Sequence, residues 1–450
     1  MSNPHQRQLH LGLNVLAAGM HPAAWRLPSS NPLGFVDPAE WKEIGRLAEL
    51  GTLDAIFLAD SPSIIWAPVG QPPLGLDPGV LLAKLAGDTE HIGLVGTVST
   101  SFDTPYGVAR RFSSVDHLSG GRAGWNVVTG TDPTAAKNFG SEDHLPREAR
   151  YRKAEEFVDV VTHLWDSWDE DAIVADKASG EFAREDRIHP IAHDGEFFHV
   201  EGPLTLPRSP QGRPVIVQAG GSPPGRELAA RHAEAVFCSL GTIEDAHAFT
   251  ADIRRRAAAH GRGPDAIRIL PGLSFVLGGT EAEARARNDE LNELAGQQRY
   301  DNFAWQIGVD ASELHPDKPL PQWLLDTKEL SAAGSQGARE IVVNIARREP
   351  TLTVRELLDR VITWHRLIVG TPEQVAASIE EWFAAGAVDG FNLMPDVFTS
   401  GLEPFVEHVV PLLRKAGIFR EEYTGSTLRH HLGLERPVSR YATTSDRKIA

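Results

Sequence analysis

Residues 371–395 read TPEQVAASIEEWFAAGAVDGFNLMP, a stretch that contains one helix signal followed by one strand signal. Thr371 and Gln374 form a capping box with a proline at the first helical position, which predicts where the helix begins. A stripe of apolar residues at helical spacing follows, and Gly386 predicts the end of the helix. The run 391–394 is then the last strand. A helix that leads directly into a strand is the repeating unit of an α/β protein.

The same alternation continues back to the N-terminus. Amphipathic helical runs, such as the one opened by Asp37 and Pro38 and the long one near 150–165, separate short β-rich runs. Eight strands with intervening helices predict a closed (β/α)8 barrel, with a doubly wound open sheet as the alternative. The seven strands expected before 391–394 are 9–15, 55–60, 92–100, 124–129, 215–220, 233–238 and 267–277.

Three stretches break the alternation. Residues 166–207 are polar and rich in turn formers, which predicts a loop with a hairpin. Residues 280–350 are helical and form an insertion between the seventh and eighth strands. In a barrel, an insertion on the C-terminal side would cover the active-site mouth. The polar tail from 418 onward is expected to wrap over a neighbouring element or to fray.

Composition excludes several classes of protein. The 450 residues carry 61 acidic and 44 basic side chains, a formal net charge of -17, which argues against a nucleic-acid partner. No apolar run approaches the roughly 20 residues that span a bilayer, so no membrane association is expected. The polar residues 1–8 lack a signal-peptide core, so we expect a cytoplasmic protein. Cys238 is the only cysteine, which excludes a disulfide or a cysteine-based zinc site within the chain. No metal site is predicted.

Nucleotide and hydrolase signatures are absent from the sequence. There is no G-x-G-x-x-G after a strand and no G-x-x-x-x-G-K-[ST], so the fingerprints of the common dinucleotide and nucleotide folds are missing. The segment 218–227, QAGGSPPGRE, nevertheless follows a strand and opens a helix. Its glycines permit close approach of a ligand, and Ser222 can cap the helix while facing an anion. This is a phosphate site by mechanism, although spacing alone favours an ordinary helix cap.

Other polar residues occupy the expected strand ends. Asp60 is expected to end the second strand and, in a barrel, to point into the cavity, and Thr97 can face inward from the third strand. The amide of Asn126, in the middle of the fourth strand, suits a flat heterocycle. Arg147 and Tyr151 are four residues apart at the start of the long helix and would share a face that suits a phosphate. A structural role stays open for each of these residues from spacing alone.

Three longer runs carry a family resemblance: ARRFSSVDHLSGGRAGWNVVT (109–129), PQGRPVIVQAG (210–220) and DGFNL (389–393). Together with EYTGSTLR (422–429), they resemble the bacterial-luciferase-like FMN-dependent monooxygenases. The likeness is to the branch with nitrilotriacetate, pristinamycin IIA synthase, dibenzothiophene-sulfone and long-chain alkane monooxygenases. It implies a single TIM barrel of the bacterial luciferase type over 1–450, with 280–350 as a lid-like segment at the C-terminal face of the barrel.

The resemblance also implies an activity. Reduced FMN from a separate NAD(P)H:flavin reductase would react with O2 to give a flavin C4a-(hydro)peroxide, which oxygenates a small organic substrate. Asp60, Thr97, Tyr151 and Ser222 would contact FMN, with Asn126 as a further contact. Arg147 stands where a relative has histidine, and arginine suits the same phosphate.

His144 is the candidate for handling a proton, because imidazole titrates near physiological pH. A homodimer or homotetramer is the family expectation. The alternatives are a luciferase-like flavin or deazaflavin oxidoreductase that transfers hydride without oxygen, and a flavin-binding protein with no catalysis.

Overall fold

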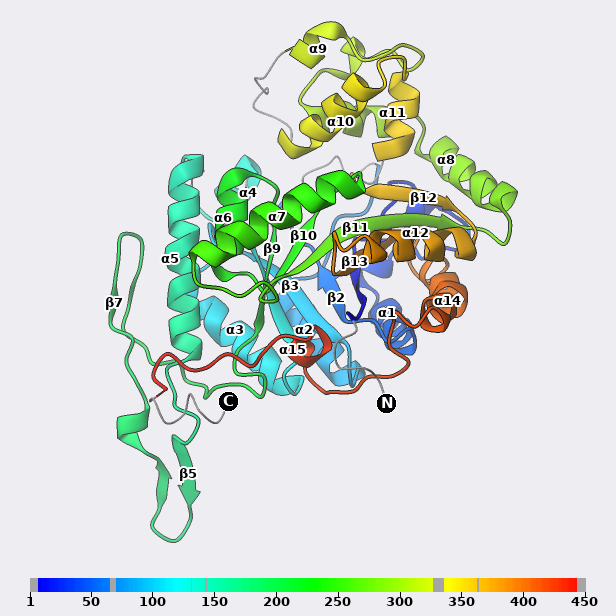
Figure 1. Cartoon of the computed structure of the whole chain (residues 1–450). Coiled ribbons are helices and arrows are strands. Elements are labelled where there is room, and N and C mark those ends of the chain that lie inside the picture. The colour runs from blue at the N-terminus through cyan, green and yellow to red at the C-terminus, as the bar shows by residue number, and fades with distance from the viewer. Residues whose placement is uncertain are drawn as a thin grey trace.

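The computed structural model describes residues 7–64, 70–130, 132–141, 144–326, 336–361 and 364–442. Eight parallel strands form a closed ring, because β10 pairs with β11 and β1 pairs with β13. The predicted (β/α)8 barrel is therefore confirmed, and the open sheet is excluded (Figure 1). The ring strands are β1 (His10–Val15), β2 (Ala55–Leu58), β3 (Gly93–Ser99), β4 (Ala123–Val128), β9 (Val215–Ala219), β10 (Ala235–Cys238), β11 (Arg268–Leu277) and β13 (Gly390–Pro395).

Helices surround this ring and bury their apolar stripes against it. Several begin in the same way, with a side chain that accepts a hydrogen bond from the first turn and a proline at the start. A proline is well tolerated there because the first N–H groups of a helix lack partners within it. The main barrel helices are α1 (Pro38–Leu50), α2 (Pro78–Asp88), α3 (Pro105–Leu118), α5 (Arg147–Trp165), α6 (Pro223–His232), α7 (Ile243–Ala259), α12 (Pro372–Ala384) and α14 (Val410–Lys415).

A helical insertion separates β11 from β12 (Arg366–Gly370) and stands above the strand ends in Figure 1. Its helices bury a small apolar core of their own, built from residues 303–361. The helical part runs on to Val361, and its residues 327–335 lie outside the described part of the chain. Its helices are α8 (Glu281–Ile307), α9 (Gln322–Asp326), α10 (Gln336–Arg348) and α11 (Val354–Val361), and we call residues 281–361 the helical insertion.

Strand β12 is a feature that the sequence analysis did not predict. It pairs in parallel with the C-terminal half of β11, from Leu273 to Leu277, while β10 pairs with the N-terminal half. It therefore lies beside the ring rather than within it. Residues 166–207 also form two hairpins where one was expected: β5 (Ile173–Asp176) with β6 (Glu181–Ala183), and β7 (His193–Asp194) with β8 (His199–Val200).

The tail closes the base of the barrel, as Figure 1 shows in red. We call residues 418–442 the C-terminal strap; it contains the short helix α15 (Leu428–His431). The side chains of Leu428 and Leu432 pack with apolar residues of β2, β3, β9 and β10. The predicted wrapping is thus observed for the described part of the tail. No helix in the described ranges is long and apolar enough to cross a membrane.

Candidate active site

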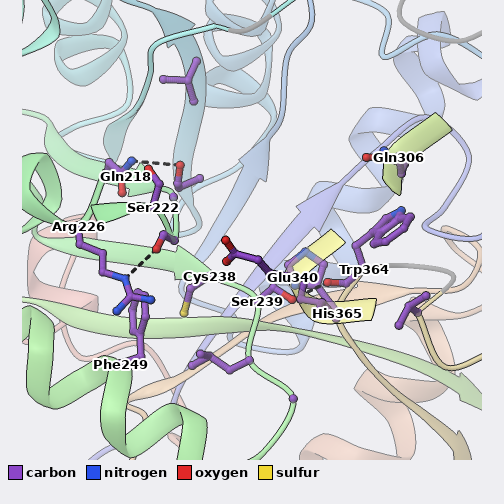
Figure 2. Close-up of a pocket in the computed structure, with 18 of the residues that line it drawn as sticks. Gln218, Ser222, Arg226, Cys238, Ser239, Phe249, Gln306, Glu340, Trp364 and His365 are labelled. Carbon is purple, nitrogen blue, oxygen red and sulfur yellow. Dashed lines mark hydrogen bonds between the residues drawn. The ribbon is translucent and has the colours of Figure 1, made fainter. Parts of the chain in front are cut away.

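A cavity of about 2130 Å³ opens where the barrel strands end. Residues that follow β2, β3, β4, β9 and β10 line one wall, and residues of the helical insertion line the other. Figure 2 shows Gln218, Ser222 and Arg226 on one side, with Trp364 and His365 across from them. The C-terminal end of a (β/α)8 barrel is where such folds place their active sites.

Ser222 and Tyr151 meet at one end of this cavity, although 71 positions separate them in sequence. The Ser222 hydroxyl caps α6 by accepting a hydrogen bond from the Gly225 N–H, and it lies 3.2 Å from the Tyr151 hydroxyl. Pro223 and Pro224 occupy the first helical positions and have no N–H to offer. An anion here would therefore be held mainly by hydroxyl and guanidinium groups.

Two arginines of α5 line the same end of the cavity. Arg147 is exposed at the first position of the helix. Arg150 is half-buried, and its guanidinium has no hydrogen-bond or ion-pair partner among the described residues. Burial lowers the pKa of Arg150, because a desolvated cation without a counter-ion is disfavoured. The sequence analysis missed Arg150, although its place three residues after Arg147 and beside Tyr151 was a usable signal.

Arg226 supports the glycine loop that precedes α6. Its Nε donates to the Gly221 carbonyl at 2.8 Å, and its guanidinium lies 4.9 Å from the centroid of the Phe249 ring. Beside it, Gln218 donates from Nε2 to the Ala219 carbonyl, while its buried Oε1 has no hydrogen-bond partner in the described part of the chain. A buried acceptor without a partner is costly. Gln218 is therefore suited to accept a hydrogen bond from a bound ligand.

Three predicted polar residues lie around the barrel mouth. Asp60 lines the cavity; burial raises the pKa of its carboxyl to about 6, and the nearby Asp77 adds to the effect. Thr97 also lines the cavity, and its hydroxyl accepts a hydrogen bond of 2.8 Å from the Asn126 amide. Asn126 is buried and does not line the cavity itself. Its Nδ2 supports Thr97, its Oδ1 has no hydrogen-bond partner among the described residues, and the predicted contact with FMN stays a prediction.

His144 lies near the cavity without lining it. Its Nε2 is 2.6 Å from the Asp132 carbonyl, so that nitrogen carries the proton, and its ring packs on Phe102, which does line the cavity. Among the described residues the cavity includes one histidine, His365, whose ring stacks on Phe237 at 4.9 Å. Burial lowers the pKa of His365 to about 4, so the imidazole is neutral at pH 7.

Charge on the described cavity wall is balanced. Six arginines and six carboxylates line it, against a net charge of -17 for the whole chain. No group of His, Cys, Asp or Glu in the described residues has the arrangement of a metal site. The site can therefore take an organic anion without the repulsion that the overall charge suggests.

The donor set fits a flavin mononucleotide. The end of the cavity at Tyr151 and Ser222 has two hydroxyls and two guanidiniums that suit a phosphate, and Gln218 has an unused buried acceptor among the described residues. A flavin ring has both N–H donors and carbonyl acceptors, which Gln218, Asp60 and Thr97 can match. The cavity is larger than one cofactor needs, which leaves room for a substrate between the mouth and the helical insertion.

Comparisons with known proteins converge on one family. The family described as luciferase-like monooxygenase matches residues 15–389. Nitrilotriacetate monooxygenase component A of Aminobacter aminovorans is 44% identical, covering 98% of this chain and 99% of that protein. N-acetyl-S-(2-succino)cysteine monooxygenase of Bacillus subtilis (strain 168) is 43% identical, covering 97% and 99%. The crystal structure of a riboflavin lyase with modified FMN and riboflavin has a TM-score of 0.83 and 34% identity, covering 96% and 98%.

Proposed function

The chain belongs to the luciferase-like monooxygenase family, and on that premise we propose that it is the oxygenase of a two-component system using reduced FMN as co-substrate. It is a flavin-dependent monooxygenase. The observation that carries the choice of FMN is the phosphate end of the cavity, where Tyr151, Ser222, Arg147 and Arg150 converge. Riboflavin, which has no phosphate, would leave these groups unused.

The proposed oxygenation needs one external reductant, which is reduced FMN. When bound, reduced FMN supplies two electrons to O2, so that one oxygen atom enters the substrate and the other leaves as water. Ser222, Tyr151 and the two arginines would hold the phosphate, and Asp60 and Thr97 would orient the ring. The helical insertion would act as a lid that excludes water from the site.

His144 is the proposed residue for handling a proton. Its Nε2 donates to the Asp132 carbonyl, and this contact holds the ring beside Phe102, which lines the cavity. We expect His144→Asn to reduce substrate oxygenation and to divert oxygen into hydrogen peroxide. Normal oxygenation and coupling in that variant would show that the assignment is wrong.

The proposed substrate is a small molecule that carries carboxylates. The two relatives of 44% and 43% identity are named for nitrilotriacetate and for N-acetyl-S-(2-succino)cysteine, and both compounds carry several carboxylates. The balanced charge of the cavity wall is compatible with such a substrate. This class is favoured over the alkanes and sulfones that other members of the family oxidise.

The partner would be an NAD(P)H:flavin reductase that supplies reduced FMN by diffusion. Dependence on NAD(P)H favours a cytoplasmic site of action, and a homodimer or homotetramer is the proposed assembly. Hydride transfer without oxygen and flavin binding without catalysis find no support in the family or in the relatives described above.

Oxygen uptake tests the proposal. The purified chain, a flavin reductase, NADH and FMN are mixed with nitrilotriacetate or with N-acetyl-S-(2-succino)cysteine. We expect one of these compounds, or a related carboxylate, to give an oxygenated product in proportion to the oxygen consumed. Catalase and a reaction without the chain control for peroxide from free flavin. Reduction of a deazaflavin under anaerobic conditions, with no oxygenated product in air, would contradict the proposal.

A further inference from the structure

Helix α10 of the helical insertion turns a mixed face toward the cavity, with three polar residues and two isoleucines whose side chains also pack on the core of the insertion. The lining residues recur at helical spacing, whereas Val342 and Ala346 face the other way and belong to the core of the insertion. The lining residues of α10 are Glu340, Ile341, Asn344, Ile345 and Arg348. A wall with a carboxylate, an amide and a guanidinium indicates a substrate with polar or ionised groups.

Arg348 is the cationic end of this face, and it is held loosely. Its Nη2 lies 3.4 Å from Oδ1 of Asp245 in the first turn of α7, and the two side chains are 58% and 44% exposed. The guanidinium has no other partner among the described residues. Exposed ion pairs of this kind contribute little to stability. A guanidinium also prefers a bidentate carboxylate, which this contact does not provide.

A second guanidinium on the same wall has a similar arrangement. Arg360 of α11 lines the cavity and uses one nitrogen, Nη1, to contact Glu349 at 2.5 Å, with both side chains about half exposed. Glu340, the anionic end of the α10 face, lies eight residues before Arg348, roughly 12 Å along the helix at 1.5 Å per residue. Arg360 contacts Glu349, the residue after Arg348, so both arginines lie toward the end of the wall away from Glu340.

We propose that Arg348 binds a carboxylate of the substrate and that Asp245 competes with the substrate for this guanidinium. The inference rests on the proposed function and adds to it the residue that selects the substrate class. Asp245 keeps the guanidinium over the cavity until a substrate carboxylate takes its place. Arg360 is placed to bind a second carboxylate on the same molecule.

If Asp245 competes with the substrate for Arg348, substitutions of these two residues should change the dissociation constant of the substrate in opposite directions. Nitrilotriacetate and N-acetyl-S-(2-succino)cysteine are titrated calorimetrically into the full chain, with and without FMN. We expect Arg348→Met to raise the dissociation constant of the bound probe about ten- to one-hundred-fold, the usual range for a charged hydrogen bond. Arg348→Lys should recover part of that loss. Asp245→Asn should lower the dissociation constant several-fold, because the guanidinium loses its competitor.

Arg347→Met is the matched control. Arg347 neighbours Arg348 and carries the same charge, but it donates to the Leu325 carbonyl and does not line the cavity. We expect it to change the dissociation constant less than two-fold. Equal weakening by Arg348→Met and Asp245→Asn would show that the pair only fastens the insertion to the barrel, and would overturn the proposal. Failure of the wild-type chain to bind either probe would also overturn it.

FMN binding separates this proposal from the proposed function. Flavin affinity, measured by fluorescence quenching, should change less than two-fold in the Arg348 and Asp245 variants. If the wild-type chain binds the carboxylate probes but not FMN, the proposed function fails while the assignment of Arg348 stands. If FMN binds and the probes respond equally to the Arg347 and Arg348 variants, the assignment of Arg348 fails alone.

Discussion

At the residue scale, the phosphate end of the cavity depends on side chains from two helices that meet only in the folded chain. Ser222 starts α6 and Tyr151 lies in the second turn of α5, and their hydroxyls are 3.2 Å apart. Each hydroxyl alone is an ordinary helix feature. Together with the Arg150 guanidinium, which has no partner among the described residues, they form a set of groups that suits an anion.

Arg150→Met should weaken FMN binding about ten- to one-hundred-fold, because a charged hydrogen bond to phosphate contributes about 1.5–3 kcal/mol. Riboflavin affinity should stay within two-fold, since riboflavin carries no phosphate. Fluorescence quenching of both flavins measures the two effects. Equal losses for FMN and riboflavin would place Arg150 outside the phosphate site. Arg152→Met is the control, because Arg152 pairs with Glu196 and is absent from the described cavity wall.

Asp60 gives the site a pH dependence. Its carboxyl titrates at about 6 in the folded chain, against an ordinary pKa of 3.8, so the folded state binds the proton more tightly. This favourable contribution is complete below about pH 4 and is lost as the pH rises through 6. Asp60→Asn should therefore be more stable than the wild-type apoprotein at pH 7, by about 1–2 kcal/mol after allowance for solvent screening, and equal to it near pH 4.

Urea unfolding at pH 4, 5, 6 and 7 measures that difference. The control is Asp186→Asn, because the Asp186 side chain is 82% exposed, and its difference from the wild type should not change with pH. If the difference in unfolding free energy between Asp60→Asn and the wild type were the same at every pH, the pKa of Asp60 would not be raised in the folded chain.

How far the sequence predicts a residue depends on where its partners lie. Thr97 was predicted to face inward from the strand alternation, and it does. Asn126 faces the same interior, but its Nδ2 donates a hydrogen bond to the Thr97 hydroxyl. Thr97 lines the cavity, and Asn126 lies behind it. Thr97 and Asn126 meet because they are paired in the register of β3 and β4. This register cannot be predicted from the local sequence pattern of either strand.

At the element scale, the regular strands and capped helices were predictable because their signals are local. The strand β12 was not, although Leu367, Ile368 and Val369 form a short apolar run. Its partner is the C-terminal half of β11, beyond the part that pairs with β10. β12 can add to the closed eight-strand ring only because the C-terminal half of β11 extends beyond its pairing with β10. The number of strands predicted from the sequence does not show this extension.

The C-terminal strap should matter more for stability than for binding. Burial would raise the pKa of Glu234, but the guanidiniums of Arg429 and Arg213 outweigh it and hold this pKa at about 2. Arg429→Met would remove both short hydrogen bonds to the buried Glu234 and leave it with only the longer Arg213 ion pair at 4.0 Å, at a cost of about 3–5 kcal/mol. Leu428→Ala would leave a void at the barrel base, at a cost of about 2–5 kcal/mol.

Chemical denaturation measures both variants, and FMN affinity at low denaturant should stay unchanged, since neither residue lines the described cavity wall. Val438→Ala in the same strap is the control, because its side chain is 45% exposed. Wild-type stability in both strap variants would show that the strap does not secure the barrel base.

At the scale of the whole molecule, the chain has a large core in the barrel and a separate small core in the helical insertion. The insertion could be recognised in sequence from its helical period and its position between strands. Its contribution to the cavity could not, because the lining face of α10 becomes apparent only when the insertion is placed over the strand ends.

Because the barrel and the helical insertion have separate apolar cores, we expect them to unfold with different free energies. Hydrogen exchange followed by mass spectrometry should show the amides of α10 and α11 opening at lower denaturant than those of β1 to β4. A carboxylate probe that binds Arg348 should slow exchange in α10 and leave β1 to β4 unchanged, because it contacts the insertion directly. Exchange of all these elements in a single transition would contradict the independence of the insertion.

The C-terminal strap, which closes the base of the barrel, also limits how early the chain can complete its fold during translation. Leu428 is translated some four hundred codons after β1, which takes about 20–80 s at roughly 5–20 residues per second. For most of that interval β1 also lacks its neighbour β13, so this edge of the nascent sheet stays unpaired. We therefore expect the nascent chain to be exposed to aggregation at this edge until translation is nearly finished, however stable the finished barrel is.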